Sequence, residues 1–159
     1  PTLPARDVNG TTNGEGCGIA LLFVAAATNA AAISNTTVSY TNSKGVSGRT
    51  ATLTTAAGSA IPATPVIGTM IWFALAAGDT GVMSIQSITL GTSLVTGTVS
   101  LMITRDICTI GTTIVNVAAA KTIGSPGIKL YNGTCLLHNI MASATTATFM
   151  SGSLAVMEK

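Results

Sequence analysis

Charged side chains are scarce in this chain of 159 residues: Asp, Glu, Lys and Arg make up 8% of it, against about 25% in ordinary globular domains. The formal net charge is +2, so the chain lacks the basic surface that nucleic acids and anionic membranes attract. Disorder is excluded as well, because 47% of the residues are hydrophobic and disordered chains combine low hydrophobicity with high charge. The length fits one folded domain.

The residues that usually carry out catalysis are equally few. His138 is the only histidine, and Cys135 precedes it by three positions, a spacing that on a strand turns the two side chains to opposite faces. The five acids fall in expected turns and termini, and Asp79 is interpreted as a turn residue. We therefore expect no metal site, no cofactor and no enzymatic activity.

Cysteine and long apolar runs are limited too. The three cysteines, Cys17, Cys108 and Cys135, are too few and too far apart for a small disulfide framework. We interpret them as reduced core thiols, and the alternative is one disulfide plus one free thiol. The most apolar stretch, residues 18–27, falls short of the roughly 20 residues that span a bilayer. No signal peptide is recognised, so we expect synthesis in a cytoplasm.

What the chain does contain is β-strand patterning. Apolar residues alternate with Thr and Ser between turns rich in Gly and Asn, which predicts an all-β fold, an antiparallel β-sandwich or jelly roll of about eight strands. The expected strands are 17–27, a hairpin over 36–54, 66–75, 82–90 with a bulge between Ile85 and Ile88, 95–105, 107–117, 135–141 and 149–157. Residues 60–65 are expected to be a rigid proline-containing connection, and residues 30–33 can add a helical turn.

The clearest alternation lies in residues 95–105. It predicts a half-buried strand whose inward residues are Val95, Gly97, Val99, Leu101 and Ile103.

The first sixteen residues form a separate segment. They contain two prolines and two Asn-Gly pairs without a sustained period, which predicts an extended N-terminal arm before a single domain over 17–159. The alternative is a frayed terminus. The arm residues expected to contact a partner are Pro1, Leu3, Pro4, Arg6 and Val8.

The scarcity of charge also bears on assembly. A soluble monomer usually carries about 25–35% charged residues on its surface, whereas most of this exterior has to consist of Thr, Ser, Gly, Asn and apolar atoms. Such a surface favours association. We expect a homo-oligomer or a subunit of a larger assembly.

Three segments resemble known proteins. Residues 38–50, 72–90 and 144–154 resemble small structural proteins from the virions of tailed bacteriophages. The resemblance lies in a β-rich, weakly charged sequence with many Thr and Gly residues and not in a diagnostic motif. This resemblance implies a capsid decoration, or cement, protein: a jelly-roll subunit, often a homotrimer, that binds the major capsid protein on the outside of the shell and bridges capsomers. The arm over 1–16 would then be the reaching element.

Two alternatives remain open from the sequence. The first keeps the virion but places the protein in a tail, a neck or a fibre attachment. The second is a carbohydrate-binding β-sandwich, against which the sequence offers only Trp72, Tyr40 and Tyr131 as Trp and Tyr residues. Trp72 is expected mid-strand among core residues, which leaves little aromatic surface for a sugar.

Overall fold

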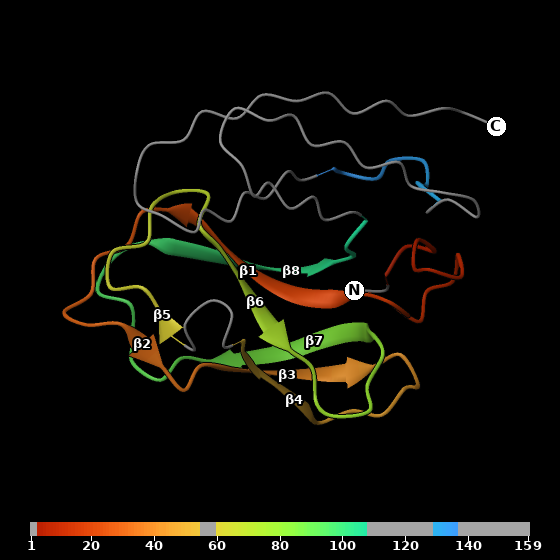
Figure 1. The fold of residues 1–159 in the computed structure, drawn as a ribbon, viewed down its shortest axis with the longest axis horizontal. Coiled ribbons are helices and arrows are strands. Elements are labelled where there is room, and N and C mark those ends of the chain that lie inside the picture. Colours follow the sequence, from red (N-terminus) through yellow and green to blue (C-terminus); the bar gives the residue numbers. More distant parts are fainter. Residues whose placement is uncertain (1–2, 55–59, 108–128, 137–159) are drawn as a thin grey trace, which may run out of the picture.

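The computed structural model describes residues 3–54, 60–107 and 129–136, and this part of the chain is built from β-strands without a helix (Figure 1). The strands are β1 (Gly18–Ala25), β2 (Ile33–Ser34), β3 (Thr37–Asn42), β4 (Arg49–Leu53), β5 (Ala60–Ile61), β6 (Met70–Ala74), β7 (Val82–Thr89) and β8 (Thr98–Thr104). The strands expected over 107–117, 135–141 and 149–157 lie largely or wholly outside the described residues. Within the described ranges, no helix is available that could cross a bilayer.

Six of the strands form one antiparallel sheet in the order β7-β3-β4-β6-β1-β8, and β2 pairs with β5 in a small second sheet. Figure 1 shows β1 and β8 in one layer, β3, β4 and β7 in the other, and β6 crossing between them. Side chains from both layers meet in a single core. The expected all-β, antiparallel, sandwich-like fold is therefore confirmed, with one strongly curled sheet supplying both layers.

Alternation along β1 explains how the core forms. Ile19, Leu21 and Phe23 are fully buried and face the interior. On one side they pair with Ile103, Leu101 and Val99 of β8, and on the other Ile19 and Leu21 pair with Phe73 and Ile71 of β6. Because paired residues share a face of the sheet, three adjacent strands present one continuous apolar surface to the interior.

The expected hairpin is β3–β4. Val38 pairs with Ala51, both are fully buried, and the alternating Thr50 and Thr52 are exposed. The side-chain oxygen of Asn42 closes the turn by accepting hydrogen bonds from the backbone of Lys44 and Val46.

The expected irregularity in β7 is also present. The pairing of β3 with β7 shifts between Ser39 and Tyr40 and again between Thr41 and Asn42. On β7 the first shift falls between Ile85 and Ser87, inside the span where the sequence predicts a bulge. Bulges increase local twist and bend the strand, which suits a strand at the edge of a curled sheet.

Three local expectations differ from the structure. Residues 66–69 form a turn in which the Thr69 N–H donates to the Val66 carbonyl and Gly68 has a φ of +84°, so β6 begins only at Met70. β8 likewise begins at Thr98, after Gly97 with a φ of +101°, and Val95 is exposed rather than inward.

The third difference concerns residues 30–33, where no helical turn forms. Ile33 instead pairs with Ile61 in the small sheet, and both side chains are buried in the core. Burial of two large apolar groups outweighs the weak helix propensity of the preceding alanines.

The N-terminal segment also takes a compact course in place of the extended one expected. Its residues 3–16 run through turns that are organised by Asp7, which is 2% exposed. The Asp7 carboxylate accepts hydrogen bonds from the backbone of Asn9, Thr11 and Glu15 and from the Thr11 hydroxyl. Burial raises the pKa of Asp7, but these hydrogen bonds outweigh it and leave the pKa below its ordinary value.

The segment then joins the main sheet through backbone contacts. The Val82 N–H donates to the Gly14 carbonyl and the Gly16 N–H donates to the Thr80 carbonyl, with Glu15 bridging to Gly81. Part of the expected arm therefore belongs to the folded domain.

Candidate functional site

Charge is distributed unequally between the two ends of the molecule. Residues 16–43, 50–78 and 80–104 contain no charged side chain, and these ranges include every strand residue except Arg49, together with the loops at one end. The charged residues that the structure describes all lie at the other end, in or beside the N-terminal segment, the β3–β4 turn, the β6–β7 connection and the end of β8. They are Arg6, Asp7, Glu15, Lys44, Arg49, Asp79, Arg105, Asp106 and Lys129.

Asp79 organises the charged end. Its Oδ2 accepts hydrogen bonds from the Tyr40 hydroxyl at 2.6 Å and from Arg49 Nε at 2.8 Å, and its Oδ1 accepts one from Asn42 Nδ2 at 2.8 Å. Arg49 also donates to the Ala77 carbonyl. The carboxylate thus ties the β3–β4 hairpin to the β6–β7 connection and covers the end of the core where Tyr40 is buried.

These contacts shift the pKa values at this end. The hydrogen bonds from Tyr40, Arg49 and Asn42 lower the pKa of Asp79 from 3.8 to about 2, and the same carboxylate raises the pKa of Arg49. Burial and the bond to Asp79 raise the pKa of Tyr40. Both oxygens of the Asp79 carboxylate accept hydrogen bonds from side chains of the fold itself, so we interpret this cluster as structural.

At the opposite end, the described residues include exposed apolar side chains and no charged one. Val24 at the end of β1 is 43% exposed, Val66 and Ile67 in the turn before β6 are 65% and 70% exposed, and Val95 before β8 is 73% exposed. We call this surface, defined by Val24, Val66, Ile67 and Val95, the uncharged end.

Hydrogen bonds hold the loops of the uncharged end together. Ala27 and Asn29 donate from their backbone to the carbonyls of Pro65 and Ala63. Asn29 Oδ1 accepts the Val95 N–H, and Thr96 Oγ1 accepts the Thr28 N–H. Val66, Ile67 and Val95 therefore lie in loops that are hydrogen-bonded to the segment following β1, and Val24 lies at the end of β1 itself.

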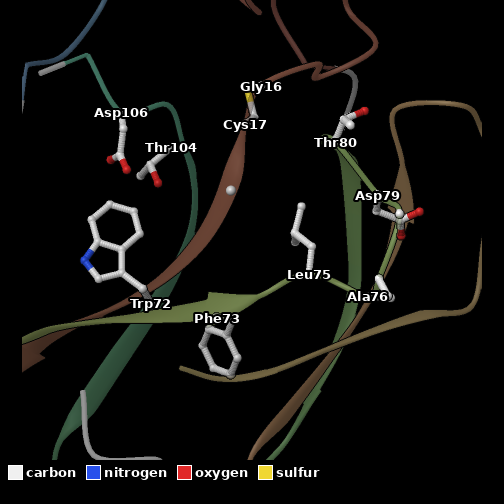
Figure 2. Close-up of a pocket in the computed structure, with 13 residues that line it drawn as sticks. Gly16, Cys17, Trp72, Phe73, Leu75, Ala76, Asp79, Thr80, Thr104 and Asp106 are labelled. Atoms are coloured by element: carbon white, nitrogen blue, oxygen red, sulfur yellow. The ribbon is translucent and has the colours of Figure 1, made fainter. Parts of the chain in front are cut away.

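A hollow of about 550 Å³ lies on the outer face of the sheet toward the charged end. Figure 2 shows Trp72, Thr104 and Asp106 on one side of it, Leu75, Asp79 and Thr80 on the other, and Cys17 between them. Trp72 is half-buried and pairs with Ala20, whereas its neighbours Ile71 and Phe73 pair with the core residues Leu21 and Ile19. The expectation that Trp72 sits among core residues is therefore wrong.

The residues singled out in the sequence do not converge on one site. Pro4, Arg6 and Val8 are exposed, Leu3 is half-buried, and Arg6 donates to the Gly133 carbonyl. Pro1, Cys108 and His138 lie outside the described residues. Cys17 is half-buried and Cys135 is exposed, so the interpretation as core thiols is wrong for Cys135.

Asp79 is more than the turn residue that the sequence suggested, since its carboxylate bonds to side chains 30 to 39 positions away. Nothing in the residues around it signals those partners. The uncharged end, by contrast, had a signal in the sequence, namely the long segments without a charged residue. Once the strands pair, loops from these segments lie together on one surface.

Neither metal chemistry nor similarity to known proteins assigns a function. Within the described ranges, no three His, Cys, Asp or Glu side chains are grouped as metal ligands. No family model, curated protein or solved structure matches the chain.

Proposed function

We propose that this chain is a non-enzymatic structural subunit of a bacteriophage particle, of the capsid decoration or cement type. It binds the major capsid protein on the outside of the shell, acts as a homotrimer and stabilises contacts between capsomers. The resemblance of residues 38–50, 72–90 and 144–154 to virion proteins supports this, as does the all-β fold with few charges. The proposal requires a surface of this chain at which contact with another protein is more favourable than contact with water.

The uncharged end is the observation that carries the proposal. Its four apolar side chains are 43% to 73% exposed, and fully burying a side chain of this kind stabilises a complex by about 1.5–3 kcal/mol. Fixed loops reduce the entropy lost on docking. A trimer presents three such surfaces, so that modest affinity at each gives strong attachment overall.

The N-terminal segment is a second proposed contact. Pro4, Arg6 and Val8 are exposed there, although the segment belongs to the folded domain from Asp7 onward. It lies at the charged end, so in this proposal the two ends meet different neighbours.

The copy number of the chain tests its place in the particle. Quantitative mass spectrometry of purified particles gives its ratio to the major capsid protein. A ratio near one to one supports the cement role, and a handful of copies moves the protein to the tail or neck. Complete absence from the particles overturns the virion role.

A pair of matched variants tests the docking surface. Ile67→Lys places a charge on the uncharged end, whereas Val46→Lys places one on an exposed valine of the β3–β4 turn at the charged end. We expect Ile67→Lys to lower occupancy on shells that lack the protein and Val46→Lys to leave it unchanged. Equal occupancy of the two variants removes the uncharged end as the contact surface.

A further inference from the structure

The hollow on the outer face of the sheet (Figure 2) is unrelated to the uncharged end. We propose that it is a binding site for a neutral sugar, with Trp72 as the stacking surface and Asp106 and Thr104 as the hydrogen-bonding groups. This proposal does not depend on the virion role.

Small side chains on β1 create the hollow. On the outer face of the sheet, Gly18 pairs with Thr104 of β8, and Ala20 pairs with Trp72 of β6. A side chain added at Gly18 would meet nothing within 4 Å, so open space lies above the middle strand. The larger groups on β6 and β8 form walls around a floor that has almost no side chains.

Within the part of the chain that the structure describes, no hydrogen bond is made by the polar side chains on the Trp72 side. Thr104 and Asp106 are two positions apart and so share a face as the chain leaves β8. Among the described residues, the Thr104 hydroxyl is buried without a hydrogen-bond partner, an arrangement that is costly unless something completes it. Asp106 is exposed and has no ion pair within the described ranges.

The other carboxylate that lines the hollow, Asp79, is already hydrogen-bonded within the fold. Asp79 accepts hydrogen bonds from Tyr40, Asn42 and Arg49. Arg105, next to Asp106, is not among the residues that line the hollow; its guanidinium donates to the carbonyls of Asp7 and Lys129 and lies over the Tyr131 ring. The proposal therefore assigns recognition to Trp72, Thr104 and Asp106.

This combination matches the chemistry of a sugar. A pyranose has an apolar face of C–H groups that packs on an indole ring, and hydroxyls at its edge that donate to a carboxylate and exchange hydrogen bonds with a threonine hydroxyl. The volume of about 550 Å³ falls in the range of small-molecule sites, about 300–1,000 Å³. Anions are disfavoured, because both charged side chains that line the hollow are carboxylates.

The chain offers a site-specific readout, because Trp72 is its only tryptophan. We would titrate the purified protein with glucose, galactose, mannose, N-acetylglucosamine and their linear oligomers and follow the tryptophan emission. The proposal expects at least one of these sugars to shift the emission in a saturable manner. Ethylguanidinium and tetramethylammonium, titrated in parallel, represent a cation held over the ring by Asp106.

Two variants locate the binding. Gly18→Val places a larger side chain in the hollow at a position where an added Cβ meets nothing within 4 Å, and valine is favourable in strands. Asp106→Asn keeps the shape of the site and removes the carboxylate. Thr50→Val is the matched control, since it places the same side chain at an exposed position of β4.

The proposal expects Gly18→Val and Asp106→Asn to weaken binding by about tenfold or more, and Thr50→Val to leave it unchanged. It is overturned if no sugar in the panel saturates, if only the cations bind, or if Gly18→Val binds as well as the parent chain.

Discussion

The Tyr40 hydroxyl donates to Asp79 Oδ2 at 2.6 Å and accepts the Ala76 N–H at 2.9 Å. One buried phenol oxygen therefore serves both the acidic side chain and the backbone of the β6–β7 connection. Because Tyr40 stands on β3, this single atom fixes the position of the connection relative to the hairpin. Tyr40 and Asp79 are therefore the first residues to substitute in order to test how the charged end stabilises the fold.

Removing the hydroxyl in Tyr40→Phe is expected to lower the free energy of unfolding by about 1–3 kcal/mol, because the part-buried Ala76 N–H and Asp79 carboxylate each lose a hydrogen bond. Urea denaturation measures this change, with an unaltered slope showing that the fold is intact. Ser39→Ala on the same strand is the control, since the Ser39 hydroxyl makes only an exposed 3.5 Å contact with Gln86. If the two variants lose equal stability, the hydroxyl has no special role.

Low pH is expected to lower the stability of the fold by protonating Asp79 at the charged end. Its pKa is about 2 in the folded chain against an ordinary 3.8, so the ionised carboxylate stabilises the fold above about pH 4. That contribution is lost as the pH falls toward 2. The pKa values of Asp7 and Glu15 are also lowered, which adds acid sensitivity of the same sign.

Asp79→Asn separates these contributions. We expect the variant to be less stable than the parent chain at neutral pH and to lose less stability between pH 4 and pH 2, as followed by denaturation at a series of pH values. Parallel stability curves for the two proteins would show that Asp79 does not cause the acid sensitivity.

Two glycines with the same backbone conformation should respond differently to alanine. Gly14 and Gly45 have φ values of +74° and +80°, so both substitutions carry the left-handed strain of about 1–2 kcal/mol. At Gly14 an added Cβ would also lie 1.8 Å from the Val82 carbonyl oxygen, whereas at Gly45 it would meet nothing within 4 Å. Thermal denaturation should show a clearly larger loss for Gly14→Ala, and equal losses would contradict the docking of the N-terminal segment.

Truncation distinguishes an arm from an integral segment. Deleting residues 1–16 removes the bonds from Gly14 and Gly16 to Val82 and Thr80, and we expect a lower melting temperature. Deleting residues 1–5 leaves those bonds in place and should change the melting temperature little. A domain that is equally stable without all sixteen residues would restore the interpretation as a free arm.

The sequence predicted those parts of the fold that depend on local alternation. The hairpin from Thr37 to Leu53, the existence of β1 and the bulge in β7 follow from local sequence patterns of the kind that a linear reading records. Val95 was assigned to a strand from the alternation over residues 95–105 and Val66 from the apolar stretch over residues 66–75, but Gly97 and Gly68 adopt positive φ values and delay each strand.

The site was less predictable for a physical reason. Strand alternation places Trp72 on the opposite face of β6 from Ile71 and Phe73. Because β6 is apolar on both faces, the pattern alone does not show which face packs in the core. The partners of Asp79 come from another hairpin and depend on the curl of the sheet. Only the uncharged end could have been anticipated, by following the spacing of charges through the predicted turns.

The strand order has a consequence for synthesis on the ribosome. β1 is the first strand made, but its partners in β6 and β8 lie about 50 and about 80 residues further along the chain. At about 5–20 residues per second, its most apolar segment waits on the order of 10 s for its second neighbour. During that interval the β3–β4 hairpin can close, while β1 remains available to chaperones or to other nascent chains, so yield in the cell should depend on how fast translation reaches β8.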